Sequence, residues 1–273
     1  MKKTFRVDVR MESYKSFFDH GWAARIMEAT AATPIAQAVF DLCAAWRGVS
    51  NTHAMPYLML EQFRGFAKGL LGAHWHGAKW IAATQQGLAS EMGDGLSNMG
   101  RRRMLAALAR LETRFRETLA STELKELDID ILAMWEKHLE NFEMQAVLWG
   151  SQRLCYAAVY YSYEDFLTRC VAAARIDPDY RMPRRNDFAK DLADAFSSNL
   201  RDRCWSNSAI NVARLARHAL VHNGGRVTDE LGKITHGILV IDGELQIMAT
   251  DTSDLYQLLK ERAKELAAAF PPP

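Results

Sequence analysis

The stretch RLARHALVHNGGRV, residues 214–227, contains the end of an amphipathic helix and the glycines that stop it. Small and apolar side chains fall on one side of a helix that is expected to run from about Asn207 to His222. Gly224 and Gly225 then supply the backbone freedom that a helix end needs. Because the same helical periodicity recurs through most of the chain, this stretch indicates an all-α fold.

Further helices are expected at several places in the sequence, separated by short polar or Pro- and Gly-containing segments. They cover residues 34–47, 56–72, 74–92, 101–119, 122–149, 151–175 and 186–203. The pattern changes at ITHGILVIDGELQIMA, where two β-rich arms surround Asp242-Gly243 and predict one small β-hairpin at about 234–249. A last helix is expected from residues 250–253 to about Phe270.

The clearest linker is GDGLSNMG, residues 93–100, and a second break is expected near residues 121–128. This second break divides the chain into a helical region, 1–125, and a helical domain, 126–273. Long helices on both sides of it could also pack as one body.

The composition places few limits on function. The chain has 273 residues, of which 49% are hydrophobic and 25% charged, with a formal net charge of +1, so no global field points to nucleic acid or membrane. The four cysteines form no CxxC pair and are expected to be free thiols, as in a reducing compartment. The first residues lack the apolar core of a signal peptide, and no apolar run reaches the roughly 18 residues of a membrane span. A cytoplasmic location is therefore expected.

Cationic side chains crowd the last turns of the 207–222 helix. On a helical wheel one polar stripe carries Asn207, Asn211, Arg214, His218 and His222. Arg217 lies off this stripe, about 140° from His222 at about 100° per residue. The two side chains can converge if the last turn unwinds or if two chains face each other. The helix end favours a cation, which suits His222 as a general acid or phosphate donor, and suits it equally as a cap of the last carbonyls.

The order RHALVH, residues 217–222, followed by NGG, resembles the R-x4–6-H signature of the HEPN superfamily (higher eukaryotes and prokaryotes nucleotide-binding), in particular its bacterial ribonuclease and toxin-type domains. Two further stretches resemble helices and the hairpin of that superfamily: VYYSYEDFLTRCV at 159–171 and ILVIDGELQIMATDTSDLYQLL at 238–259. The resemblance covers roughly residues 145–270. It implies a HEPN-like helical bundle, whereas residues 1–125 have no role that we can assign.

The resemblance also implies an activity. Catalytic HEPN proteins are metal-independent endoribonucleases whose dimers place two such motifs in one cleft, often in toxin–antitoxin or antiphage systems. Carried over to this chain, Arg217 would hold the scissile phosphate and His222 would act as general acid or base. His218, Arg214 and Asn223 would support them. The implied partners are RNA, a second copy and an antitoxin or other defence protein, with no cofactor and no metal.

Two alternatives remain open at this point: a non-catalytic HEPN module that binds nucleotide, RNA or protein, and an all-α scaffold in which the motif only caps a helix.

Other candidate residues have structural explanations as well. Arg47 and His53 fit the looser motif spacing but straddle an expected loop. His74 and His76 point apart on a helix and lack further metal ligands. The arginine clusters 101–103 and 181–185 are typical of solvated segments or of contacts to RNA phosphates. Glu164 is expected to pair with an arginine near the cleft or to form a structural salt bridge.

Overall fold

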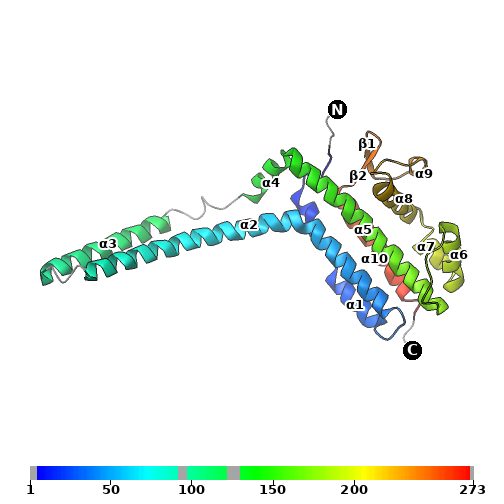
Figure 1. The fold of residues 1–273 in the computed structure, drawn as a ribbon, viewed down its shortest axis with the longest axis horizontal. Helices are drawn as coiled ribbons and strands as arrows, with labels where there is room; N and C mark the ends of the chain where they lie inside the picture. Colours follow the sequence, from blue (N-terminus) through cyan, green and yellow to red (C-terminus); the bar gives the residue numbers. More distant parts are fainter. Residues whose placement is uncertain (1–4, 92–96, 122–129, 271–273) are drawn as a thin grey trace. The chain divides into compact units, whose positions relative to one another are not determined.

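The computed structural model describes residues 5–91, 97–121 and 130–270 and is mostly helical, as expected for an all-α fold (Figure 1). Among these residues the elements are a short 3-10 helix, ten α-helices and one two-stranded antiparallel sheet. Their bounds are η1 Met11–Tyr14, α1 His20–Thr30, α2 Ala36–Glu91, α3 Asn98–Ser121, α4 Ile131–Leu139, α5 Phe142–Arg175, α6 Arg185–Ala195, α7 Ser198–Cys204, α8 Ser208–His222, α9 Asp229–Gly232, β1 Leu239–Ile241, β2 Glu244–Gln246 and α10 Ala249–Ala267.

The chain divides into two compact units. Unit 1 combines residues 1–57 with residues 136–273, and unit 2 comprises Leu58–Trp135. This grouping differs from a division at residue 125, because the N-terminal segment packs on the C-terminal helix within unit 1. The Asp19 backbone N–H donates to the Tyr256 hydroxyl at 3.0 Å, and Lys260 lies 3.3 Å from the Asp19 carboxylate. Unit 2 contains the C-terminal part of α2 and, running alongside it, α3 (Figure 1).

α5 is the central helix of unit 1 and packs against α6, α8 and α10. It is buried along most of its length because aromatic and aliphatic side chains repeat at helical spacing, among them Val159, Tyr160, Tyr163, Phe166 and Leu167. The side chain of Trp46 on α2 is fully buried against α5, and its indole N–H donates to the Val159 carbonyl at 3.0 Å. These contacts hold the first part of α2 to α5.

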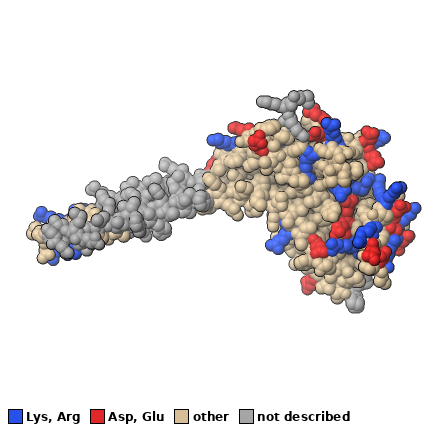
Figure 2. All heavy atoms as spheres, in the orientation of Figure 1, with Lys and Arg blue, Asp and Glu red and all other residues tan. Residues whose placement is uncertain are grey.

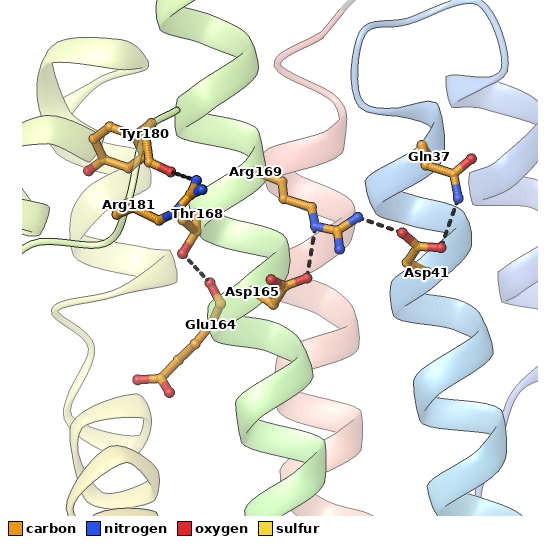
Figure 3. A network of polar contacts seen from close by, with 8 residues as sticks. All are labelled: Gln37, Asp41, Glu164, Asp165, Thr168, Arg169, Tyr180 and Arg181. Carbon is orange, nitrogen blue, oxygen red and sulfur yellow. Dashed lines mark hydrogen bonds and ion pairs between the residues drawn. The ribbon is translucent and has the colours of Figure 1, made fainter. Parts of the chain in front are cut away.

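A second contact between α2 and α5 lies at the surface, as Figure 3 shows. The Arg169 guanidinium bridges Asp41 on α2, at 2.5 Å, and Asp165 one turn away on α5, at 2.9 Å. The neighbouring carboxylate, Glu164, points away from this network (Figure 3). Charges of both signs are intermixed on the face of the described surface that Figure 2 shows, in keeping with a net charge near zero.

Several expected helix boundaries are wrong. α2 continues through Pro56, where a break was expected, so the segment before Pro56 is helix rather than loop. α5 likewise continues through Gly150, and the break falls earlier, where the Asn141 side chain accepts from the N–H groups of Glu143 and Met144 and caps the helix. The helix expected at 186–203 is two helices, because the chain leaves helical geometry at Phe196 and Ser197 caps α7.

The expected hairpin is present but shorter than 234–249, with three residues in each strand. Asp242 and Gly243 both have positive φ, 52° and 76°, which is the geometry of a type I′ turn. Leu245 donates to the Gly225 carbonyl and Val227 donates to the Gly243 carbonyl, both at 2.9 Å. The hairpin therefore pairs with the loop that follows α8. Within the described residues, no helix has the length and apolarity to cross a membrane.

Candidate functional site

α8 begins and ends where the sequence predicts. The Asn207 side chain accepts from the Ala209 N–H, and the helix ends at His222. Beyond it, Gly224 and Gly225 have positive φ, 61° and 88°, and the Gly225 N–H donates to the Ala219 carbonyl at 2.8 Å. The buried face carries Ile210, Ala213, Leu215, Ala216 and Ala219. This packing fixes the opposite side of α8, and with it the cationic residues, relative to α5.

Arg217 lies against α5. One guanidinium nitrogen is 3.7 Å from the Glu164 carboxylate, and the guanidinium carbon is 5.9 Å from the centre of the Tyr161 ring. The two charged side chains are 23% and 15% exposed, so the pair is largely shielded from water. The Arg217 Nε is buried and has no hydrogen-bond partner in the described part of the chain. The expectation that Glu164 pairs with an arginine is confirmed, and Arg217 keeps unused donor capacity.

Burial raises the pKa of the Glu164 carboxyl, while the charges of Arg217 and then Arg214 oppose that rise. Burial also lowers the pKa of the Arg214 guanidinium, as does the nearby charge of Arg185. Both shifts have the same physical cause, since a charge that is partly removed from water loses hydration energy. The site therefore holds charged groups in a medium where electrostatic interactions are stronger than at a fully solvated surface.

His218 and His222 face solvent together. Their ring centres are 4.9 Å apart and the ring planes are tilted by 45°, as expected for residues one turn apart. Both residues are exposed, and so is Asn223, whose backbone N–H donates to the Ala219 carbonyl. Within one chain the structure thus brings His218 to His222 and Arg217 to Glu164 and Tyr161. No hydrogen bond, ion pair or ring contact joins Arg217 to His222 among the described residues.

A small pocket opens beside Arg217. It has a volume of about 170 Å³ and is lined by Glu164, Met182, Pro183, Arg185, Trp205, Arg214, Arg217 and His218. Two wider hollows adjoin it through shared lining residues: one between α8 and α9 contains Arg214 and His218, and one beside α6 contains Arg185 and Arg214. Arg214 lies at the junction of all three, with its guanidinium donating to Asn211 Oδ1 at 3.0 Å.

Sequence reasoning missed Arg153, which supports the turn after His222. Its guanidinium donates to the Gly224 carbonyl at 2.5 Å and stacks over the Trp149 ring at 4.1 Å. Gly225 has a φ of 88°, which favours glycine, and a Cβ atom there would lie 1.8 Å from an Arg153 nitrogen, so a larger residue would be strained and would displace the Arg153 guanidinium. Arg153 and Gly224 lie far apart in sequence and share no motif. No signal in the sequence could have found this contact.

Of the other candidates, Arg185 joins this site through the pocket lining, whereas His53, Arg102, Arg103 and Arg181 do not. His53 is fully buried in α2, where its ring nitrogens contact the Ser13 carbonyl and the Gln152 side chain, both at 2.9 Å. The side chains of His74 and His76 lie outside the described residues. Arg102 and Arg103 are exposed on α3, and Arg181 is exposed in the loop before α6. Among the side chains that the structure describes, no three His, Cys, Asp or Glu residues are grouped as a metal site.

Comparisons with known proteins do not assign the chain to a family. No protein-family model, no curated protein and no solved structure matches the chain. The site is therefore interpreted from its own geometry and from the motif that it carries.

Proposed function

We propose that this protein is a metal-independent endoribonuclease of the HEPN type, with Arg217 and His222 as its catalytic residues. The observation that carries the proposal is the arrangement at the end of α8. A shielded guanidinium, whose Nε has no partner among the described residues, and an exposed imidazole leave the same helix within five residues of each other. A fixed cation and a mobile proton carrier are the two groups that RNA transesterification needs.

In the proposed reaction the RNA 2′-hydroxyl loses its proton and attacks the adjacent phosphorus. The new O2′–P bond forms as the P–O5′ bond breaks, and the leaving 5′-oxygen takes up a proton. This gives a 2′,3′-cyclic phosphate and a 5′-hydroxyl. Arg217 stabilises the negative charge that develops on the phosphate oxygens, and His222 transfers the proton. His218, Arg214 and Asn223 surround these two residues and act in support.

The proposed active unit is a dimer, because Arg217 and His222 contact different neighbours within one chain. An exposed apolar stripe on α5 lies next to them: Val147, Leu154 and Tyr161 are 62%, 73% and 58% exposed and are spaced by seven residues. α8 runs antiparallel to α5, since Arg217 meets Tyr161 while Gly224 meets Arg153. Val221, 53% exposed and one turn beyond Arg217, extends the stripe. Two such stripes facing each other would bring Arg217 of one copy toward His222 of the other.

The first test is cleavage of a mixed RNA pool in EDTA by the wild type, Arg217→Ala and His222→Ala. Both variants are expected to lose cleavage, whereas Arg201→Ala, which removes a surface arginine paired with Asp202, is expected to retain it. Cleavage that EDTA abolishes, or that both site variants retain, would contradict the mechanism. Binding of RNA without cleavage by the wild type would favour the non-catalytic module instead.

Mixing the two inactive variants tests the composite cleft. In a mixed dimer one cross-chain pair of Arg217 and His222 receives both substitutions and the other pair receives neither. Since about half of the dimers are mixed, co-refolded protein should regain about a quarter of the wild-type activity. If Arg217 and His222 of the same chain formed each site, the mixture would regain no cleavage activity. Thermal unfolding of each variant before mixing separates lost chemistry from lost folding.

A further inference from the structure

The small pocket beside Arg217 has the composition of an anion site. Arg185, Arg214, Arg217 and His218 line it, against one carboxylate, that of Glu164. The three arginines come from two different helices, Arg185 from the start of α6 and the others from α8. Guanidinium groups that reach one small volume from different elements can surround a ligand. A planar carboxylate is satisfied by one such group, whereas a tetrahedral phosphate accepts from several directions.

Two buried polar atoms at this place have no partner within the described residues. One is the Nε of Arg217, and the other is the hydroxyl of Tyr160, whose side chain is fully buried on α5. Tyr160 interacts electrostatically with Glu164, Arg214 and Arg217, so its hydroxyl lies among the same charges. Buried donors without acceptors are unfavourable, and an anion in the pocket would supply an acceptor for Arg217, which lines it.

The size of the pocket limits the ligand. A volume of about 170 Å³ is below that of typical sites for whole small-molecule ligands, which begin at about 300 Å³. It suits a phosphate group rather than a nucleoside. The two wider hollows, which share Arg214 with the pocket, leave room for the rest of a strand near α9 and α6.

We infer that Arg185 and Arg214 hold an internal phosphate of a bound RNA strand, next to the phosphate held by Arg217. The position beside the scissile phosphate rests on the proposed function, whereas the phosphate site itself does not. Glu164 competes with the strand for the guanidinium of Arg217, because its carboxylate already lies 3.7 Å away. Arg185 and Arg214 therefore contribute to substrate binding, and Glu164 limits it.

The experiment is the binding of a fluorescent 2′-O-methyl RNA, which cannot be cleaved by 2′-OH attack, measured by anisotropy at several NaCl concentrations. Arg185→Gln and Arg214→Gln should each weaken binding about tenfold and reduce the slope of log K against log salt by about 0.7 per lost phosphate contact. Glu164→Gln should tighten binding. The matched control is Arg201→Gln, which removes the same charge outside the pocket and should change binding little.

If Arg185→Gln and Arg214→Gln bind as the Arg201→Gln control does, the phosphate site is refuted, even if RNA cleavage in EDTA is observed. If the two variants weaken binding while the wild type never cuts RNA, the phosphate site is supported and the proposed catalytic function is contradicted.

A strand with a 5′-phosphate should bind no more tightly than one with a 5′-hydroxyl. A gain that depends on the 5′-phosphate and is lost in Arg214→Gln would place a terminal phosphate in the pocket and overturn the internal position.

Discussion

The carboxylate of Glu164 on α5 lies 3.7 Å from the guanidinium of Arg217 on α8, in a place where both side chains are mostly shielded from water. This pair connects the residue proposed to hold phosphate with the central helix of unit 1. It fixes the position of Arg217 and at the same time competes for its hydrogen bonds. Ionisation of Glu164 as pH rises should therefore lower both the stability of the protein and its binding of anions.

Replacing Glu164 with Gln should make the protein less sensitive to pH. Burial raises the folded-state pKa of this carboxyl above its usual value near 4.5, so the protonated form is favoured in the folded state. The stability that it contributes is present below that usual value and is lost as pH rises through the folded-state pKa. Relative to wild type, Glu164→Gln should gain stability as pH rises, by at most about 1.4 kcal/mol per pH unit. Urea unfolding at a series of pH values from acid to neutral measures this. If the free energy of unfolding of Glu164→Gln fell relative to that of the wild type as pH rises, the ion pair with Arg217 would dominate instead.

His53 should destabilise the fold in mild acid. Burial lowers its pKa below the usual 6.5, against the opposing effects of Ser13, Gln152 and Asp8. The unfolded chain therefore takes up a proton before the folded chain does, and stability falls as pH drops below about 6.5. Each pH unit costs up to about 1.4 kcal/mol. His53→Gln should remove this part of the pH dependence, whereas replacing the exposed His222 with Gln should leave it in place. If the free energies of unfolding of wild type and His53→Gln changed equally with pH, the prediction would be contradicted.

Two glycines close to the site should respond to alanine in opposite directions. Gly225 has a φ of 88°, and a Cβ there would collide with the Arg153 guanidinium, so Gly225→Ala should cost roughly 1–3 kcal/mol. Gly150 lies within α5 with no atom near the added Cβ, so Gly150→Ala should stabilise by about 0.5–1 kcal/mol. Chemical unfolding measures both changes. Equal effects of the two substitutions would mean that the turn after His222 tolerates a side chain.

The apolar stripe on α5 should control assembly. Leu154→Glu places a charge at a position that is 73% exposed, so the folded monomer should tolerate it, while a dimer through this face should dissociate and lose RNA cleavage. Ile176→Glu is the control, because Ile176 is 91% exposed at the end of the same helix and lies outside the stripe. Sedimentation velocity and the EDTA cleavage assay give the readouts. A wild-type protein that is monomeric at every concentration would refute the composite cleft.

Local features of the structure were predictable from the sequence because their causes are local. Asn207 caps α8, Gly224 and Gly225 end it, and Asp242-Gly243 forms the hairpin turn, since each depends on the backbone preferences of one or two residues. The offset of Arg217 from the polar stripe also follows from helical geometry alone, and it correctly separates Arg217 from the two histidines. The pairing of Glu164 with an arginine needed only the proximity of two amphipathic helices.

Features that depend on distant parts of the chain were not predictable. Pro56 and Gly150 are usual signs of a helix boundary, yet both lie inside long helices whose other residues pack well enough to offset the unfavourable ones. The contact of Arg153 with Gly224, and the packing of Asp19 on Tyr256, join segments with no shared pattern. The HEPN identity, RNA cleavage, the defence setting, the cytoplasmic location and the dimer remain predictions that rest on the motif and the site.

The four cysteines of the chain are all free and buried. Burial raises the pKa of the thiols of Cys43, Cys155 and Cys204 to about 11 and raises that of Cys170 well above its usual value, so none is a ready nucleophile at neutral pH. The four native thiols should therefore react little with thiol-labelling reagents. One cysteine introduced at Leu154 would take up a spin label selectively, and the label-to-label distance between two copies would report directly whether their α5 helices meet.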